Sequence, residues 1–295
     1  AALRRHGIRL TVAGKQSAAP VNASDDPAAL GRQDLIFVAV KAQGLSAVAD
    51  DIATMMGPET VVVPILNGLP WWYFQIGAQG DLAGYRLRAV DPQGNLARAI
   101  RPAAIVGAVA FPSIANPEPG HTVHVSGERY IFGEPAGGLT PRVEAIHTLV
   151  KGAGLVGAET STDIRREIWL KLLGNGCFNP VSLLTGSPTD LMIDDPHVYR
   201  MFVGLMNEML ALGRAVGVPV AIEPEDRLAM TRKLGHIKTS MLQDLEALRP
   251  VELDGILGVV VELAGKVGMP APIASAVYAM ARQKSRLLGI YKEPG

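Results

Sequence analysis

The sequence predicts an α/β Rossmann-like N-terminal domain, residues 1–162, followed by an all-α C-terminal domain, residues 163–295. Short apolar, β-branched runs separated by turn residues recur through the first part, which is typical of strands. After residue 163 the apolar residues recur every three or four positions, which is the helix period. The length of 295 residues also favours two domains, because one domain typically takes about 150 residues.

The expected strands of the first domain alternate in part with helices. Several strands are apolar on both faces, as in a sheet that helices cover on both sides. Strands are expected at residues 8–12, 34–40, 60–66, 104–111, 122–125, 129–133 and 154–159. Helices are expected at residues 1–6, 44–56 and 141–151, and residues 112–120 are expected to form a proline-rich loop.

The second domain is expected to consist of amphipathic helices. They lie within residues 163–173, 196–217, 223–249, 251–268 and 273–288. Pro250 ends one helix, because a residue before proline avoids helical dihedral angles, and it suits the first turn of the next. Glu252 is therefore expected in a first helical turn, where the helix dipole favours its ionised form. At that position the Glu252 carboxylate is expected to pair with Lys171 and to keep its ammonium group protonated. The alternative is that Glu252 is only a favourable negative charge at a helix N-terminus, without a partner at Lys171.

Composition excludes several classes of function. The 28 Lys and Arg residues balance 28 Asp and Glu residues, so no strong field for nucleic acid or an anionic membrane is expected. No apolar run approaches the length of a membrane helix. Cys177 is the single cysteine, so an intramolecular disulfide is excluded, and a cytoplasmic location is expected. Its apolar neighbours predict that Cys177 lies in the core. His121 and His124 lie at odd spacing in a strand, so they do not chelate one metal ion together.

One G-x-G-x-x-G pattern occurs, at Gly152, Gly154 and Gly157. A helix is expected before it and a strand after it, whereas a phosphate-binding loop needs the strand first and the helix N-terminus second. The pattern therefore predicts a helix-to-strand turn.

Polar residues follow two of the expected strands. Lys41 comes directly after the strand that ends at Val40, and Asn67 and Gly68 follow the next strand. Such positions line the crevice at the carboxyl ends of the strands, where nucleotides bind in open α/β sheets. The alternative is that Lys41 is a solvated loop cation and Asn-Gly a simple turn.

The first helix of the second domain carries a polar stripe. Lys171, Asn175 and Asn179 recur every four residues among apolar neighbours. Gly174 and Gly176 lie in the same helix and weaken it by about 1 kcal/mol each, which is understandable if a ligand or another backbone approaches there. The alternative is an exposed amphipathic face with an extended lysine.

Four segments together resemble the ketopantoate reductase family, also called 2-dehydropantoate 2-reductases. They are VKAQ from Val40, PILNGLPWWYF from Pro64, REIWLKLLGNGCFNPVSLLTG from Arg166 and HIKTSMLQDLEALRPVELDG from His236. The resemblance covers essentially the whole chain. It implies a Rossmann domain that binds NADPH, a helical C-terminal domain, and reduction of the ketone of 2-dehydropantoate to pantoate in coenzyme A biosynthesis.

The resemblance also implies roles for individual residues. Lys171 matches the family's catalytic lysine, and Glu252 its glutamate at the nicotinamide and substrate. The residues implied to bind the 2-oxo acid substrate are Asn67, Asn175, Asn179 and Ser240. The residues implied to contact the cofactor are Lys41, Asn67, Gly68, Ser113 and Glu252.

The sequence departs from the family at two places. The family's first strand, G-x-G-x-x-G loop and helix do not occur in it, so we expect either further residues upstream of Ala1 or weak NADPH binding. Thr189 stands where the family often has another substrate-binding asparagine, and residues 91–100 form an insertion. The alternatives are a related reductase of another 2-oxo acid and a catalytically silent fragment or dimerisation module. Apolar helices such as residues 251–267 are compatible with a homodimer.

Overall fold

A computed structural model describes residues 2–293 of the protein and divides them into two compact units. Unit 1 holds residues 2–38, Val48–Ile65 and Ala103–Ile164, and unit 2 holds Ala39–Ala47, Leu66–Pro102 and residues 165–293. The last passage of the chain from unit 1 to unit 2 follows Ile164, close to the predicted boundary at residue 162. Two earlier segments also belong to unit 2, and the division into domains 1–162 and 163–295 stays a prediction.

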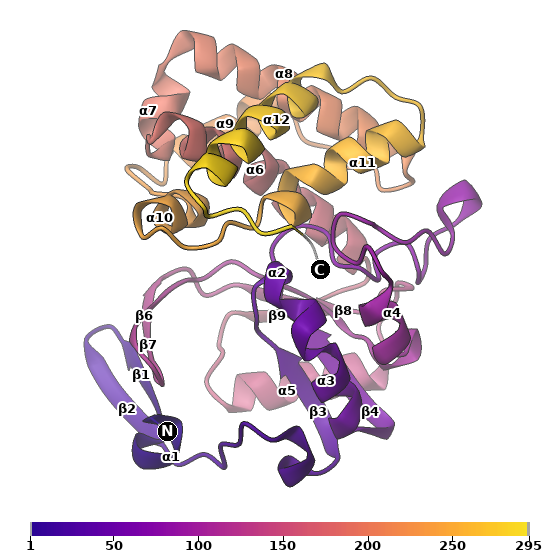
Figure 1. Ribbon diagram of the computed structural model, residues 1–295, viewed down its shortest axis with the longest axis vertical. Helices are drawn as coiled ribbons and strands as arrows, with labels where there is room; N and C mark the ends of the chain where they lie inside the picture. Colours follow the sequence, from indigo (N-terminus) through magenta and orange to yellow (C-terminus); the bar gives the residue numbers. More distant parts are fainter. Residues whose placement is uncertain (1, 294–295) are drawn as a thin grey trace. The chain divides into compact units, whose positions relative to one another are not determined.

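The described strands lie in unit 1 and form three groups (Figure 1). The first is a sheet of order β2-β1-β7-β6, made of β1 (Ile8–Val12), β2 (Lys15–Ala19), β6 (Ser113–Glu118) and β7 (His121–Ser126). The second is the parallel pair of β3 (Gln33–Val38) and β4 (Met56–Pro64). The third has the order β5-β8-β9, with β5 (Gly107–Ala110), β8 (Tyr130–Gly133) and β9 (Ala158–Ser161). A bridge between Val62 and Ile105 links the second group to the segment entering β5.

Helix α5 (Pro141–Gly152) packs its apolar face on the strands of unit 1. Its buried residues Val143, Ile146 and Val150 recur at helical spacing, as an amphipathic helix requires. The strand-side residues of this core are Val63, Val106, Ala108, Phe132 and Ala158. The shorter helical segments of unit 1 are α1 (Ala2–His6), the 3-10 helix η1 (Pro27–Leu30) and α3 (Ala49–Met55).

Two local predictions for the first half are wrong, and one strand, β2, was not predicted. The loop expected at residues 112–120 contains β6, which pairs with β7. β6 is an edge strand with a register shift after Ala115, and an edge tolerates proline because its missing N–H need not join the ladder. β2 was not expected because it is exposed throughout and has no apolar alternation. The helix expected at residues 44–56 is split into α2 (Ala42–Leu45) and α3, joined by the 3-10 helix η2 (Ser46–Val48).

The glycine pattern lies at the end of α5. This helix ends at Gly152, Gly154 has a positive φ of 100°, and β9 begins at Ala158. The predicted helix-to-strand turn is therefore confirmed, although the strand begins later than the expected residue 154.

Unit 2 is helical over its described residues, as predicted for the second half. The long helices are α6 (Ile164–Thr185), which begins at the last residue of unit 1, α8 (Pro196–Ala215) and α12 (Pro272–Leu287). The shorter ones are α2 (Ala42–Leu45), η3 (Gly80–Leu82), α4 (Asn95–Ala99), α7 (Thr189–Asp194), α9 (Pro224–Arg232), α10 (Ser240–Glu246), the π-helix η5 (Asp254–Gly258) and α11 (Val259–Lys266). The 3-10 helix η4 (Pro102–Ala104) begins at the last residue of this part of unit 2 and continues into unit 1. The helical pattern expected within residues 223–249 is broken around Gly235, whose φ is +81°. None of the helices seen between residues 2 and 293 has both the length and the apolar character of a membrane span.

A run of four buried aromatic residues anchors the segment Leu66–Pro102 within unit 2. Residues 71–74, WWYF, are at most 1% exposed. The Tyr73 hydroxyl donates a hydrogen bond of 2.7 Å to the Arg165 carbonyl, and the Tyr73 ring lies 6.3 Å from the ring of Trp169. Aromatic residues contribute large buried areas to a core. The segment that begins at Asn67 is thus packed on the first turns of α6.

Gly68 brings two backbone segments of unit 2 into direct contact. Its φ is +78°, and a Cβ atom at this position would lie 1.8 Å from the Gly255 carbonyl oxygen. The next residue, Leu69, donates its backbone N–H to the same oxygen at 2.9 Å. A side chain at position 68 would force the two segments apart.

We expect Gly68→Ala to lower the free energy of unfolding by about 2–4 kcal/mol, because it adds a backbone overlap to an unfavourable φ. Thermal unfolding of the purified variant measures the loss. The matched control is Gly84→Ala, since Gly84 has a φ of +76° but nothing within 4 Å of a Cβ, and it should cost only about 1 kcal/mol. Equal losses in both variants would contradict the close contact.

Candidate active site

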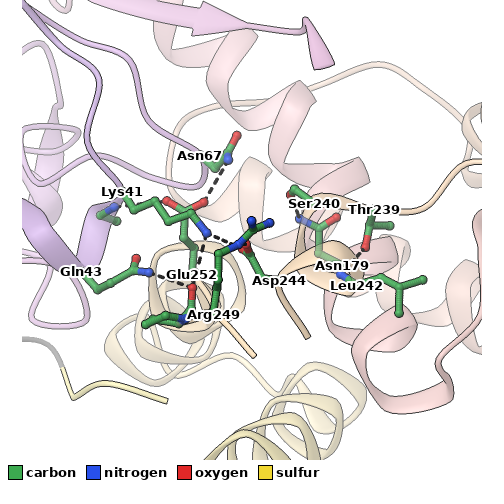
Figure 2. Close-up of polar contacts among 12 residues, drawn as sticks. Lys41, Gln43, Asn67, Asn179, Thr239, Ser240, Leu242, Asp244, Arg249 and Glu252 are labelled. Carbon is green, nitrogen blue, oxygen red and sulfur yellow. Dashed lines mark hydrogen bonds and ion pairs between the residues drawn. The ribbon is translucent and has the colours of Figure 1, made fainter. Parts of the chain in front are cut away.

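Three polar side chains of unit 2 form a chain of hydrogen bonds. The Lys171 Nζ donates to Asn67 Oδ1 at 2.9 Å, and Asn67 Nδ2 donates to Glu252 Oε2 at 3.0 Å. The backbone N–H of Ala42 donates to the other carboxylate oxygen, Glu252 Oε1, at 3.1 Å. Figure 2 shows Asn67 pointing at Glu252. An ammonium, an amide and a carboxylate from distant parts of the sequence therefore meet at one place.

Glu252 reaches this place from a segment without regular secondary structure. The prediction that it lies in a first helical turn is wrong, because helical structure begins only at Leu253. Two hydrogen bonds hold this segment: Val251 donates its N–H to the Ile290 carbonyl at 3.0 Å, and Gln43 Nε2 donates to the Pro250 carbonyl at 3.0 Å. The Glu252 carboxylate itself accepts from the Asn67 amide and from the N–H of Ala42, the first residue of α2.

The electrostatics of the cluster centre on Lys171. Burial lowers the pKa of its ammonium to about 8, and the negative charge of Glu252 opposes that shift. Desolvation disfavours the charged amine, whereas a nearby carboxylate favours it. Lys171 therefore stays protonated at neutral pH but releases its proton far more easily than an exposed lysine.

A second cluster lies beside Glu252 (Figure 2). The buried Asp244 carboxylate accepts from Lys41 Nζ at 2.5 Å and from Arg249 Nε at 3.0 Å. Lys41 also donates to the Pro250 carbonyl at 3.4 Å, while its side chain remains 44% exposed. The Lys41 head group is thus held in place at the surface of unit 2.

Asn179 and Ser240 are brought together on the other side of the site. Asn179 is 5% exposed, and its Nδ2 donates to Ser240 Oγ at 3.4 Å (Figure 2). Thr239, directly before Ser240, caps α10 by accepting from the Leu242 N–H at 3.1 Å. Asn175 lies between Lys171 and Asn179 on α6 and is partly buried. The polar stripe predicted on α6 therefore runs from Lys171 to Asn179, and Asn179 contacts Ser240 on α10.

Ser113 is the one predicted site residue outside unit 2. It begins β6 in unit 1, and its role at the cofactor stays a prediction.

The two glycines of α6 make room for side chains of neighbouring helices. A Cβ on Gly174 would lie 2.3 Å from Arg227 Nη2, and one on Gly176 would lie 2.7 Å from the Met209 methyl. Directly after Gly176, Cys177 is fully buried, as predicted for a core residue. Burial also raises the pKa of its thiol, so it is not an activated nucleophile.

The sequence alone missed Asp244, Arg249 and Gln43. Asp244 lies in the segment that carried the family resemblance, but an acid on a helix gives no signal of burial. Gln43 follows Lys41 closely, yet its contact to Pro250 joins residues more than 200 positions apart. Within residues 2–293, no three His, Cys, Asp or Glu side chains gather in a way that could hold a metal ion.

The described residues thus combine a strand-rich part and a helical part with a lysine that is hydrogen-bonded to an amide beside a carboxylate. The comparisons with known proteins give the family. The sequence model of "Ketopantoate reductase PanE/ApbA" matches residues 1–137, and that of "Ketopantoate reductase PanE/ApbA C terminal" matches residues 163–285. The chain belongs to the ketopantoate reductase family, and both the predicted resemblance and the predicted fold class are confirmed.

Individual relatives agree with this assignment. A 2-dehydropantoate 2-reductase of Mesorhizobium japonicum is 40% identical over 290 residues, which are 98% of this chain and 88% of the relative. A solved structure from Ralstonia solanacearum MolK2, described as a candidate ketopantoate reductase, is 44% identical with a TM-score of 0.94, over 98% of this chain and 88% of that chain. A D-mandelate dehydrogenase solved with NADH and anilino(oxo)acetate shares the fold, with a TM-score of 0.75 at 17% identity over 98% of this chain and 88% of that one.

We expect Glu252→Gln to lower the pKa of the Lys171 ammonium below about 8, because the substitution removes the charge that favours the protonated amine. Competitive acetylation of Lys171 across a pH series, read by peptide mass spectrometry, measures this pKa. The control is Glu246→Gln, an exposed carboxylate that pairs with Lys238. A Lys171 pKa that stays unchanged or rises in Glu252→Gln would contradict the described electrostatics.

Proposed function

We propose that this protein reduces the ketone of 2-dehydropantoate to the hydroxyl of pantoate, with NADPH as the reductant. The observation that carries the proposal is the Lys171 ammonium, bonded to Asn67 and close to Glu252, in a chain 40% identical to a 2-dehydropantoate 2-reductase. A protonated amine of lowered pKa is a suitable proton donor for the oxygen of a ketone.

The site residues fit the nicotinamide end of such a cofactor by their chemistry. An amide at Asn67, a carboxylate at Glu252 and the side-chain-free backbone of Gly68 offer donors, acceptors and close approach. The residues that would hold the cofactor are Lys41, Asn67, Gly68, Ser113 and Glu252. The G-x-G-x-x-G pattern found in residues 2–293 is a helix-to-strand turn and takes no part in this proposal. The preference for NADPH over NADH rests on the family resemblance.

Lys171 is the proposed general acid. When bound, the cofactor supplies a hydride to the ketone carbon, and negative charge develops on the ketone oxygen. An ammonium has three N–H donors, so its hydrogen bond to Asn67 is compatible with another to that oxygen. Lys171 then transfers its proton to the oxygen, an effect typically worth about 10²–10⁴-fold in rate. Glu252 keeps the amine protonated, and Asn67 orients it.

The amides and hydroxyl along α6 and α10 are proposed to position the substrate. Asn175, Asn179 and Ser240 would bind its hydroxyl and carboxylate, which fixes the ketone relative to Lys171. Holding the reacting groups in an aligned geometry removes part of the entropic barrier.

A related reductase of another 2-oxo acid is the second candidate. Thr189 favours it, because this residue is buried and its hydroxyl donates to the Gly235 carbonyl at 3.3 Å, where the family often has an amide for the substrate. A panel of 2-oxo acids that includes 2-dehydropantoate, assayed by NADPH oxidation, decides between the two. Oxidation with none of them, by folded protein, would favour the silent fragment or dimerisation module.

The proposal also includes a cytoplasmic homodimer. A ketopantoate reductase of Staphylococcus aureus with this fold is described as dimeric. Sedimentation of the purified chain tests this part separately from activity.

We expect Lys171→Ala to lower kcat by at least about 100-fold, because the reaction loses its proton donor. Steady-state kinetics with 2-dehydropantoate and a circular dichroism spectrum of the variant measure activity and fold together. Lys233→Ala removes an exposed lysine and should keep the full rate. Near wild-type turnover in Lys171→Ala would remove this lysine from the mechanism.

The rate of ketone reduction should fall as the pH rises above about 8. Lys171 acts in its protonated form, and the protonated fraction drops below half beyond a pKa of about 8. We therefore expect kcat/KM to decrease about tenfold per pH unit on the alkaline side, and the reverse oxidation to increase with pH over the same range. A reduction rate that is constant up to pH 10 would contradict the assignment.

A further inference from the structure

The last described segment of unit 2 has no part in the proposed mechanism. Residues 290–293 form a tail without regular secondary structure, which is drawn in yellow after α12 in Figure 1. A left-handed residue, Gly289 with a φ of +69°, ends α12 and turns the chain. The N–H of Ile290 then donates to the Ser285 carbonyl at 2.9 Å, and Ile290 is 1% exposed. The tail therefore leaves the helix at a fixed point.

The tail is attached to the chain on both sides of Glu252. The N–H of Val251, directly before Glu252, donates to the Ile290 carbonyl at 3.0 Å. The Tyr291 hydroxyl donates to Oδ1 of Asp254, two residues after Glu252, at 3.1 Å. Residues 251 and 252 lie outside regular secondary structure, so no helical hydrogen bonds fix their backbone. Two successive tail residues therefore hold the stretch from which the Glu252 carboxylate projects.

Tyr291 is itself held by α12. Arg282 Nε donates to the Tyr291 hydroxyl at 3.0 Å, and the Arg282 guanidinium lies 5.0 Å from the centre of the Tyr291 ring. The guanidinium of Arg286, one turn later, lies 5.6 Å from the same centre. Both arginines also pair with Glu293 of the tail. Because its hydroxyl accepts from one group and donates to another, and two cations contact its ring, Tyr291 has little freedom to move.

Asp254 is the other half of this attachment. Its Oδ1 accepts from the Tyr278 hydroxyl of α12 at 2.5 Å as well as from Tyr291. Asp254 also begins the π-helix η5, a rare conformation that occurs frequently at functional sites. The proposed mechanism gives no task to this carboxylate. Its two bonds connect the chain just after Glu252 to the last helix and to the tail.

We propose that Tyr291 is a positioning residue, which acts through Asp254 to keep the Glu252 carboxylate in place. The hydrogen bond from Asn67 to Glu252 requires that place. Lys171 then depends on the tail as well, because the negative charge of Glu252 favours its protonated form. The effect of Tyr291 on the reaction rate rests on the proposed function, whereas its effect on Lys171 needs no reaction.

The first test is Tyr291→Phe, which keeps the ring beside the two arginines and removes only the hydroxyl. We expect the pKa of Lys171 to fall from about 8 by roughly half a pH unit, because a nearby carboxylate typically contributes about 1–3 pH units and a displaced one contributes less. Competitive acetylation of Lys171, read by peptide mass spectrometry, measures this pKa. Tyr291→Ala, which also removes the ring, should lower it at least as far. An unchanged pKa of Lys171 in Tyr291→Phe would overturn the proposal.

A double-mutant cycle tests whether Tyr291 acts through Glu252. In Glu252→Gln the negative charge is already absent, so the addition of Tyr291→Phe should change the pKa of Lys171 no further. An equal fall of this pKa in both backgrounds would mean that Tyr291 acts on Lys171 by another route, and the proposal would be wrong.

A control separates position from stability. Glu208 caps the other end of α12 by accepting from the N–H groups of Ile273 and Ala274, both at 2.9 Å. Glu208→Ala should lower the unfolding temperature, because these N–H groups lose their partner, and should leave the pKa of Lys171 unchanged. A fall of this pKa in Glu208→Ala as large as in Tyr291→Phe would report a general loosening of the helices and overturn the proposal.

The two proposals fail in different ways. If the wild type reduces 2-oxo acids, Tyr291→Phe should move the alkaline limb of kcat/KM to lower pH by roughly the same half unit. If the wild type reduces none of them but the pKa of Lys171 still falls in the variant, the positioning role stands and the proposed reaction fails. If the wild type reduces them and the variant keeps both the pKa and the pH profile, the reaction stands and the role of Tyr291 is wrong.

Discussion

The hydrogen-bonded chain from Lys171 through Asn67 to Glu252 is the constraint on which the site depends. An amine buried without a carboxylate would lose its proton, and an amine in open solvent would hold it too tightly to deliver it near neutral pH. Burial together with one carboxylate places the pKa of Lys171 between these limits, at about 8.

Several backbone contacts hold that geometry. The buried aromatic run at residues 71–74 fixes the segment after Asn67 on α6, and Gly68 allows its backbone to touch that of Gly255. The 41–43 segment is joined to the stretch around Glu252 through the Ala42 N–H and the Pro250 carbonyl. The Glu252 carboxylate is therefore held by two separate segments of the chain. Its side chain has little conformational freedom left to lose when a substrate binds.

The charges of the site are unequal. Lys41, Lys171 and Arg249 are three cations beside the two carboxylates of Asp244 and Glu252. The net positive charge favours anionic ligands, although the chain as a whole is neutral. The excess of positive charge is thus a local property of this part of unit 2, and it cannot be seen in the composition of the chain.

The sequence by itself determined the strand-rich first part, the helical second part and the family, and it singled out Lys171 and Asn67, because periodicity and local motifs are recorded in neighbouring residues. It misplaced Glu252 in a helix, although contacts with distant segments hold that residue outside one, and it misplaced β6 in a loop, because an edge strand paired with the adjacent β7 tolerates proline. Only the tertiary structure decided that Asp244 is buried between two cations and that Gly174 makes room for an arginine. Such facts depend on residues far apart in the chain, and local propensity carries no information about them.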